Sequence, residues 1–379
     1  MAFAVFWANV FLIFYTYAGY SLLVVILSLL FSNRVRKDRI EPTVTFLITA
    51  YNEERNIANK LQNTLSLDYP RDKLEILVAS DGSTDRTDTI VKEFSGKGVR
   101  LVRVEGRVGK TETQNQAVRQ ATGEIILFSD ATTRYDNQAI RNLVRNYADP
   151  GVGAVSGRYE YYNPTGASIG IGNILFWKYE NLIKNAQTKI RTITGCCGCI
   201  YSIRRNLYEP LPSDIISDLT EPLKILEKGY RISFEPDAIA FEETTEKSRE
   251  EFNMRIRVIT RGMRGLFYMK RLFNPLKFFF VSFQLISHKL LRWAVPLFLV
   301  LLFVSNLFLL KDRFYRWSLA LQVLFYLLAY SGWVGERSRI RSKLLSLPLY
   351  FVIVNMASVI SLYKVFKGYK AVTWETVRK

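Results

Sequence analysis

The strongest constraint in this sequence is the separation of charge along the chain. No charged side chain occurs before Arg34. Three more charge-free stretches lie late in the chain, at Trp293–Leu310, Trp317–Gly335 and Leu344–Tyr363. A helix needs about 20 apolar residues to cross the hydrocarbon core of a bilayer. The sequence therefore predicts one N-terminal and about three C-terminal membrane helices around a polar middle.

Basic residues beside these stretches predict how the chain lies in the membrane. The first apolar stretch lacks a basic start and is too long for a cleaved signal peptide, which favours a retained anchor. Basic clusters follow the first stretch and precede the last one, at 34–39 and 337–343. Because such clusters favour the cytoplasmic side, we expect the polar middle in the cytoplasm. The C-terminus is also basic, so either the last segment is re-entrant or another segment crosses.

The net charge of +18 is compatible with nucleic acid or with a membrane surface as partner. Much of the excess flanks the apolar stretches, so we expect anionic membrane lipids and no nucleic acid. Cys196, Cys197 and Cys199 form neither a disulfide framework nor a usual zinc pattern, which favours packing roles. The sole histidine, His288, lies in a basic and apolar run, which argues against histidine-based catalysis.

The first half of the polar middle alternates strands with helices. Apolar β-branched runs predict strands at 43–50, 74–79, 99–104 and 124–128. Such alternation predicts right-handed β-α-β units and a mostly parallel sheet. Ligands of such sheets bind beyond the carboxyl ends of the strands. No glycine-rich phosphate motif follows a strand, so a dinucleotide or ATP site is not predicted.

The second half is less regular. Its patterns predict helices or strands at 152–156, 171–184, 222–228, 231–234, 238–241 and 250–262. Residues 266–292 place lysine and arginine among phenylalanine and leucine. A stretch of this kind is expected to lie in the plane of the membrane interface.

Polar segments at the predicted strand ends resemble the processive family 2 glycosyltransferases, which include hyaluronan, chitin-oligosaccharide, poly-N-acetylglucosamine and cellulose synthases. The resemblance extends over nearly the whole chain. It implies an α/β fold: a GT-A type nucleotide-sugar transferase domain with a mostly parallel sheet, plus transmembrane and interfacial helices. The matching segments are Ala50-Tyr51-Asn52-Glu53-Glu54, Asp81-Gly82-Ser83-Thr84-Asp85, Gly109-Lys110 with Asn115, Asp130-Ala131, Asp218, Arg257 with Arg261, and Trp374 with Thr376 and Arg378.

The resemblance assigns residues to the donor. It implies that Asp81 contacts a uracil base, that Tyr51 stacks on the base, and that Glu53 binds the ribose or the base. Lys110 is expected to reach the donor phosphate or sugar. The segment around Asp81 would also suit a turn that caps a helix, because Asp, Ser and Thr favour both.

A divalent cation is the expected cofactor. Negative charge builds on a diphosphate as it leaves, and Mg²⁺ or Mn²⁺ held by oxygen ligands stabilises that charge. Asp130 is the candidate metal ligand, with ribose as its alternative partner. The family pattern here is D-x-D, and Thr132 stands in place of the second carboxylate.

Asp218 is the candidate general base. A single-displacement, inverting reaction needs one group that takes the proton of the acceptor hydroxyl. The segment Ser217-Asp218-Leu219 resembles the Glu-Asp motif of the family, with serine in place of glutamate. Asp214 is the second choice, and a capping role is the alternative for Asp218. The small residues at 194–199 resemble the stretch that lines the acceptor path.

Arg257 and Arg261 lie one helical turn apart and share a helix face, where their guanidinium groups suit a diphosphate. A solvated or lipid-facing basic helix is the alternative. The family motif is Q-x-x-R-W, and Val258 and Gly262 replace its glutamine and its tryptophan. That tryptophan stacks beneath the acceptor sugar in the family. Trp374 is expected either at the donor or in an interfacial aromatic belt.

Together these patterns predict a multi-pass inverting glycosyltransferase of the bacterial inner membrane. It would transfer sugar from a UDP-sugar to a growing glycan and export the product. One competing hypothesis is a non-processive transferase with a lipid-linked acceptor, and another is an inactive sugar-nucleotide-binding subunit with export or assembly partners. The predicted parts are an anchor (1–32), a cytoplasmic catalytic domain (33–267), interfacial helices (268–292), membrane or re-entrant helices (293–367) and a tail (368–379).

Overall fold

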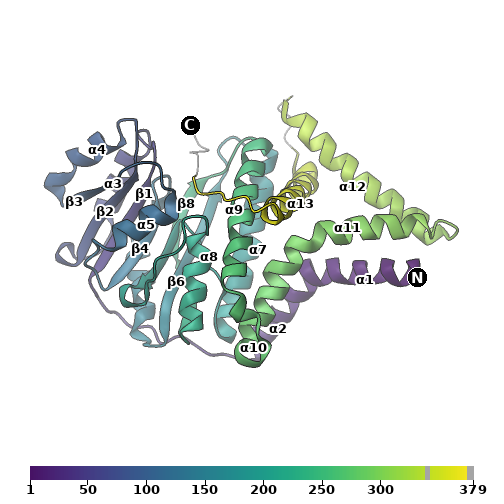
Figure 1. The fold of residues 1–379 in the computed structure, drawn as a ribbon, viewed down its shortest axis with the longest axis horizontal. Coiled ribbons are helices and arrows are strands. Elements are labelled where there is room, and N and C mark those ends of the chain that lie inside the picture. Colours follow the sequence, from purple (N-terminus) through teal and green to yellow (C-terminus); the bar gives the residue numbers. More distant parts are fainter. Residues whose placement is uncertain (338–341, 374–379) are drawn as a thin grey trace.

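The computed structural model describes residues 1–337 and 342–373 and places an α/β domain beside long apolar helices (Figure 1). Helices α1 (Ala2–Phe14), α11 (Leu291–Leu307) and α12 (Arg313–Arg337) extend away from the domain in this view. The sequence predictions for Trp374, for the tail that follows it and for part of the basic cluster at 337–343 lie outside the described residues.

The described residues form one eight-stranded sheet in the order β3-β2-β1-β4-β7-β6-β8-β5. Strands β3, β2, β1 and β4 are parallel to one another, and β8 is parallel to β6. Strand β7 runs antiparallel to both of its neighbours, and β5 runs antiparallel to β8. The predicted mostly parallel sheet is therefore confirmed. The strands are β1 (Val44–Ala50), β2 (Leu74–Asp81), β3 (Val99–Val104), β4 (Ile125–Asp130), β5 (Arg134–Tyr135), β6 (Val152–Tyr162), β7 (Ile200–Arg204) and β8 (Arg231–Glu243).

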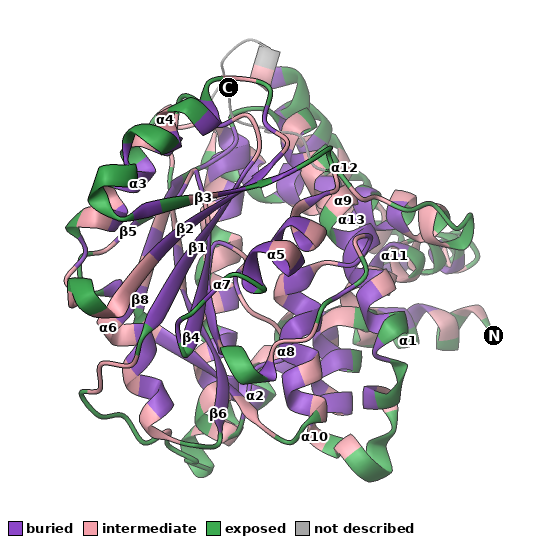
Figure 2. Ribbon diagram, turned by 60° about the vertical axis from the view of Figure 1, so that its left-hand side comes forward, coloured by how far each residue is buried: buried purple, intermediate pink, exposed green. Residues whose placement is uncertain are grey.

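Helices cover both faces of the sheet, so its central strands are buried (Figure 2). Every residue of β1 is buried. Phe46 and Ile48 pack on the face covered by α3, α4 and α6, whereas Leu47 packs on the face covered by α5 and α8. Burial on both sides explains why β1 is a continuous apolar run. The helices of the domain are α3 (Ile57–Ser66), α4 (Thr87–Glu93), α5 (Lys110–Val118), α6 (Ala139–Val144), α7 (Ser168–Ile190), α8 (Ser217–Glu227) and α9 (Ser248–Tyr268), and its short 3₁₀ turns are η2 (Arg71–Lys73), η3 (Ser95–Lys97), η4 (Arg145–Ala148), η5 (Arg205–Leu207) and η6 (Lys270–Phe273).

The sequence predictions are closest in the first half of the domain, where the four predicted strands match β1 to β4 within two residues. In the second half the predicted elements were too short. Helix α8 begins at Ser217, so Pro222 lies inside the helix rather than at its start. Proline has no N–H to donate to the carbonyl oxygen four residues earlier, and an N–H from another segment takes its place. The backbone N–H of Cys196 donates to the carbonyl oxygen of Asp218 at 2.8 Å, the acceptor that residue 222 would otherwise use.

Four helical segments among the described residues are long and apolar enough to cross a membrane, namely Ala2–Leu30, Pro275–Leu307, Arg313–Glu336 and Lys343–Phe366. Their outward surface carries exposed leucine, tryptophan and phenylalanine side chains. A continuous apolar surface of this kind suits lipid, so the four segments suggest membrane association. The remaining elements of these segments are α2 (Tyr20–Leu30), α10 (Pro275–Leu285), α13 (Lys343–Phe366) and two π-helical turns, η1 (Tyr15–Gly19) and η7 (Ile286–Leu290).

The segments differ in how much protein covers them. Half of the apolar window of α13 is buried, because α13 packs against α7, α9 and α12. The other three windows are about one-fifth buried. The stretch predicted to be interfacial contains the end of α9, η6, α10 and η7, and α10 continues through η7 into α11. The predicted membrane sidedness and number of crossings stay predictions.

Candidate active site

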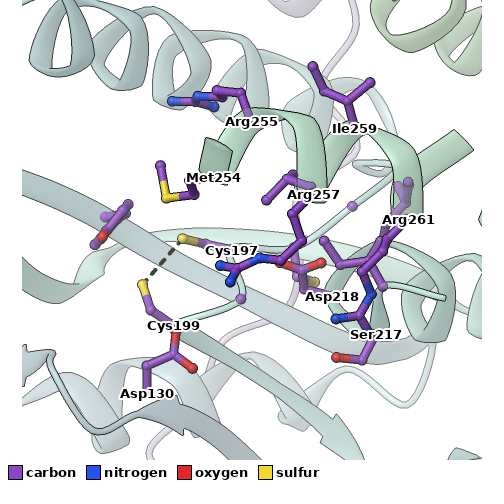
Figure 3. Close-up of a pocket in the computed structure, with 18 of the residues that line it drawn as sticks. Asp130, Cys197, Cys199, Ser217, Asp218, Met254, Arg255, Arg257, Ile259 and Arg261 are labelled. Carbon is purple, nitrogen blue, oxygen red and sulfur yellow. Dashed lines mark hydrogen bonds between the residues drawn. The ribbon is translucent and has the colours of Figure 1, made fainter. Parts of the chain in front are cut away.

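A cavity of about 400 Å³ lies at the carboxyl ends of β1 and β4 and extends between α7, α9 and α11. The carboxyl edge of a parallel sheet is the expected place for a ligand. Figure 3 shows Asp130, Asp218 and Arg257 around this space. Of the residues selected from the sequence, those that line the cavity are Glu53, Lys110, Asp130, Asp218, Arg257 and Arg261.

Lys110 and Asp130 form the floor of the cavity. Lys110 is the first residue of α5, and Asp130 is the last residue of β4. The Nζ of Lys110 forms an ion pair with Oδ1 of Asp130. Burial alone would lower the pKa of Lys110, but the neighbouring Asp130 raises the pKa above its ordinary value. Lys110 is therefore a cation at neutral pH, as a phosphate ligand must be.

The loop that follows β1 is tied to the loop that follows β2. Asn52 has a left-handed φ of 51°, and its Oδ1 accepts a hydrogen bond from the N–H of Thr84 at 2.8 Å. The N–H of Glu53 donates to Oγ1 of Thr87 at 2.7 Å. The carboxylate of Glu53 accepts from Nδ2 of Asn56 at 2.7 Å. The two segments around Tyr51 and Asp81 therefore form one unit.

Asp81 and Tyr51 lie beside the cavity without lining it. Asp81 is fully buried, and its Oδ1 accepts hydrogen bonds from the N–H of Val108 at 2.8 Å and of Gly109 at 3.2 Å. The Asp81 carboxylate therefore holds the loop that precedes α5. The guanidinium of Arg107, from the same loop, lies 4.3 Å from the centre of the Tyr51 ring. The predicted base contacts of both residues stay predictions.

The last described residues of the chain reach the same loop. Gly109 has a φ of 92° and approaches Val372 closely. A Cβ atom at Gly109 would lie 2.3 Å from the carbonyl oxygen of Val372. Only glycine fits this position, because both the backbone angle and the close approach exclude a side chain. Trp374 follows two positions later but is outside the described residues.

Asp218 stands in the first turn of α8, beside the small residues that precede β7. A Cβ atom at Gly198 would lie 2.3 Å from Oδ2 of Asp218, so the small side chain leaves room for the carboxylate. Burial raises the pKa of Asp218, and Lys110 opposes part of that rise. A carboxylate with a raised pKa is better suited to accept a proton than an exposed one.

Arg261 is a buried cation held by neutral groups. It is 4% exposed, and its Nη2 donates to Oγ1 of Thr111 at 2.8 Å and to the carbonyl oxygens of Ser213 at 3.1 Å and Ile215 at 2.8 Å. Burial, followed by the charge of Arg257, lowers its pKa to about 10. Among the described residues, no carboxylate lies within ion-pair distance of Arg261, and its Nε has no hydrogen-bond partner. A diphosphate would supply the missing negative charge.

Other residues considered from the sequence have structural partners. Oδ2 of Asp214, the second choice of base, lies 2.5 Å from Nη2 of Arg264. Cys197 and Cys199 are reduced and buried in the core, with their sulfur atoms 3.5 Å apart. His288 is 3% exposed and stacks on a tyrosine of α2.

Glu242 is a site residue that the sequence reasoning missed. Oγ1 of Thr132 donates a hydrogen bond to Oε1 of Glu242, so a carboxylate from β8 lies beside the position where D-x-D would have its second aspartate. Glu242 lines the cavity, and burial raises its pKa to about 8 despite the hydrogen bond from Thr132. The two residues are 110 positions apart, so no local motif could reveal the contact.

Trp293 is a second residue that was missed. A Cβ atom at Gly262 would lie 3.3 Å from Cη2 of Trp293, and both residues line the cavity. Helix α11 therefore places an indole ring beside the position where Q-x-x-R-W has its tryptophan. In the sequence, Trp293 is only the first residue of an apolar stretch, which hid its place beside Gly262.

Asp130 and Glu242 fit a divalent cation that is shared with a substrate. Among the described residues, no cluster of three or more His, Cys, Asp or Glu side chains could hold a metal without other ligands. Mg²⁺ is commonly bound by one or two carboxylates, with substrate phosphates and water completing the shell. Glu242 is 8% exposed and lines the same cavity as Asp130, so both carboxylates are available to a cation bound there.

Residues 45–211 match the family model described as "Glycosyl transferase family 2". This segment of the chain is similar to the family 2 glycosyltransferases. It includes Glu53, Asp81, Lys110 and Asp130, whereas Asp218 lies beyond it.

Two curated proteins are also similar to this chain. The "Probable glycosyltransferase YdaM" of Bacillus subtilis (strain 168) is 29% identical over 291 residues, which cover 70% of this chain and 67% of that protein. The "Poly-beta-1,6-N-acetyl-D-glucosamine synthase" of Staphylococcus aureus (strain COL) is 29% identical over 204 residues, which cover 52% of this chain and 49% of that protein. The chain thus matches about half the length of the synthase, and the similarity is distant.

A solved structure matches almost the whole fold. The mannosyltransferase PcManGT from Pyrobaculum calidifontis, solved in complex with GDP-Man and Mn²⁺, aligns with a TM-score of 0.71. The alignment covers 96% of this chain and 99% of that chain at 23% sequence identity. The α/β domain therefore has a GT-A-like fold flanked by long apolar helices, as the sequence predicted.

Proposed function

We propose that this protein is a membrane-bound inverting glycosyltransferase that transfers a sugar from a UDP-sugar to a hydroxyl group of a growing glycan. The observation that carries the proposal is the convergence of Lys110, Asp130, Asp218 and Arg261 on one cavity. Two cations, a metal-binding carboxylate and a buried base are the groups that a nucleotide-sugar transferase needs. The family 2 match supports this reaction class.

Lys110 and Arg261 hold the donor diphosphate in this mechanism. Arg261 has no carboxylate partner among the described residues, and Lys110 can exchange Asp130 for phosphate oxygens. A divalent cation bound by Asp130 and Glu242 would neutralise charge on the leaving diphosphate. Tyr51 and Asp81 belong to the loops beside the floor, where the nucleoside of the donor would lie.

Asp218 is the base. It takes the proton of the acceptor hydroxyl while that oxygen attacks the anomeric carbon, and the bond from this carbon to the diphosphate oxygen breaks. A single displacement of this kind inverts the anomeric centre. The burial that raises the pKa of Asp218 favours proton transfer to its carboxylate near neutral pH.

The acceptor is a sugar that packs on Trp293. An indole ring offers an apolar face to a pyranose, and Trp293 lies in the same cavity as Asp218. This ring supports a glycan acceptor even though Gly262 replaces the tryptophan of the motif. The relationship to poly-beta-1,6-N-acetyl-D-glucosamine synthases makes UDP-N-acetylglucosamine the first donor to test.

The catalytic domain lies on the cytoplasmic side of a bacterial inner membrane in this proposal. The four apolar segments anchor it, and the basic residues beside them bind anionic lipid headgroups. The proposed units keep the boundaries predicted from the sequence, and Val372 of the tail lies beside the donor loop.

The test is a transfer assay with purified, detergent-solubilised protein, Mn²⁺ and a panel of radiolabelled UDP-sugars, with a GDP-sugar as a competing donor. We expect UDP release and a labelled glycan whose new linkage has the inverted configuration by NMR. Asp218→Asn should lower transfer by about 100- to 10,000-fold. Asp214→Asn, which changes a carboxylate outside the cavity, should retain transfer.

The products also separate the competing functions. A ladder or a high polymer supports glycan synthesis, whereas a single addition supports a non-processive transferase. Absence of nucleotide release from every donor, in protein that still binds nucleotide, would support the inactive subunit and overturn the proposal.

A further inference from the structure

One wall of the cavity is made by helices and carries two lysines that the donor mechanism does not use. Lys184 comes from α7, and Lys289 comes from the π-helical turn η7 that leads into α11. Both residues line the cavity. Burial raises the pKa of Asp218, and the charges of Lys110, Lys184 and Lys289 each oppose that rise. The two lysines therefore face the same cavity as the proposed base, Asp218.

Neither lysine has an anionic partner among the described residues. Lys184 is 7% exposed, and its Nζ lies 5.4 Å from the centre of the Trp177 ring. Lys289 is partly buried. Among the described residues, no hydrogen-bond acceptor or carboxylate lies within bonding distance of either Nζ. A buried ammonium group without a partner is costly, so the site needs a negative charge from elsewhere.

The carboxylate nearest in sequence is already bound. Oε1 of Glu180, one helical turn before Lys184, lies 2.5 Å from Nη1 of Arg292 and 3.2 Å from Nε2 of His288. Arg255, the neighbouring cation of α9, is neutralised by Glu251 at 2.7 Å. Among the described residues, these ion pairs leave the two ammonium groups without an ion-pair partner of their own.

The lysine wall also adjoins the apolar helices. Lys289 belongs to the segment Pro275–Leu307, which is long and apolar enough to cross a membrane. Ile183, the residue before Lys184, is buried against Tyr20 of the N-terminal apolar segment. A π-helical turn is rare and often marks a functional position within a helix. The two lysines therefore lie on the part of the cavity wall that adjoins the apolar helices.

We propose that Lys184 and Lys289 bind the phosphate of a lipid-anchored acceptor, an isoprenoid-type phosphate whose attached glycan presents its hydroxyl to Asp218. The inference rests on the proposed glycosyl transfer and names the class of its acceptor. In this proposal Lys110 and Arg261 bind the donor diphosphate, whereas Lys184 and Lys289 bind the phosphate of the lipid acceptor.

The test is a binding measurement that does not depend on catalysis. Detergent-solubilised full-length protein is titrated calorimetrically with farnesyl phosphate, and with farnesol as the neutral match. We expect farnesyl phosphate to bind at least about tenfold more tightly than farnesol, and Lys184→Met to remove that difference. Lys184→Arg should restore it, because the arginine keeps the charge. Lys178→Met, an exposed lysine on the same helix, is the control and should bind as the wild type does.

Lys289→Met removes the second charge from a different helix and gives an independent measurement if Lys184→Met disturbs packing. Equal binding of farnesyl phosphate and farnesol to the wild type would overturn the proposal. Displacement of farnesyl phosphate by equimolar inorganic phosphate would overturn the lipid anchor, and equal displacement by phosphatidylglycerol vesicles would show ordinary headgroup contacts instead. A protein that passes this test but transfers no sugar would refute the proposed function and leave the phosphate site standing.

Discussion

The contact between Gly198 and Asp218 allows the proposed base to be displaced without changing its chemistry. An alanine Cβ at residue 198 would lie 2.3 Å from Oδ2 of Asp218, whereas ordinary contact begins at 3.4 Å. The carboxylate or the turn must therefore move by about 1 Å. Gly198 is outside the left-handed region of φ, so alanine adds no backbone strain of its own.

A displacement of about 1 Å at a reacting group lowers the rate by about 100-fold, which corresponds to about 2.7 kcal/mol of transition-state stabilisation. Gly198→Ala should therefore lower kcat by about this factor while the protein stays folded. The assay is steady-state release of UDP with saturating donor, beside a thermal unfolding curve for each variant. Gly96→Ala is the matched control, because no atom lies within 4 Å of a Cβ at that glycine.

A double-mutant cycle makes the reasoning refutable. If Gly198→Ala acts through the carboxylate, it should cause no further loss in the Asp218→Asn background, since the displaced group is already inactive. Additive losses would show that the turn acts on another part of the site. Wild-type kcat in folded Gly198→Ala would refute the role of Asp218 as base, or its position in the structure.

Glu242→Gln should weaken Mn²⁺ binding in the presence of UDP by at least about tenfold in an EPR titration. Glu243 is the exposed neighbour of Glu242, and Glu243→Gln should leave Mn²⁺ affinity unchanged. Equal Mn²⁺ affinities of the two variants would show that Glu242 does not bind the metal. Trp293→Ala should raise the KM for the acceptor by about tenfold with little change in the KM for the donor, and Trp317→Ala on the exposed face of α12 should change neither. Burial raises the pKa of Glu221 from 4.5 to about 8, so the folded state is favoured while this carboxyl is protonated. The melting temperature should therefore fall as the pH rises from the ordinary carboxyl range to about 8, and Glu221→Gln should flatten that dependence; an unchanged slope would contradict it.

The strands and the charged residues at their ends were accessible from sequence because the signals are local. Strand β1 is buried on both faces, so it is an uninterrupted apolar run, and the polar loop that follows it begins where burial ends. Asp130 stands at the end of β4 and Lys110 at the start of the helix that follows β3, and the parallel order of the strands brings the two together. The same locality explains the charge-free segments. Three of them match long apolar helices closely, whereas the helical segment that ends at Leu307 begins at Pro275, well before the predicted start at Trp293.

From the sequence, the departures from the family motifs could be recognised only as missing residues. Thr132 and Gly262 are positions where the expected carboxylate and indole are missing. In the folded chain, Glu242 and Trp293 bring the same chemical groups to these places from β8 and α11. The spacing of a local motif cannot reveal a replacement group that comes from a distant part of the chain. The packing of whole helices and strands decides which distant residue lies beside the motif.

The sequence by itself determined where the apolar segments lie, which strands form the core and which charged groups stand at the edge of the sheet, since each depends on neighbours in the chain. Only the tertiary structure decided that Asp81 holds a loop, that Asp218 fits against Gly198, and that Lys184 and Lys289 share a wall with no ion-pair partner among the described residues. Those facts depend on which side chains from distant elements occupy the same few ångströms, and burial then sets the energy of each charge.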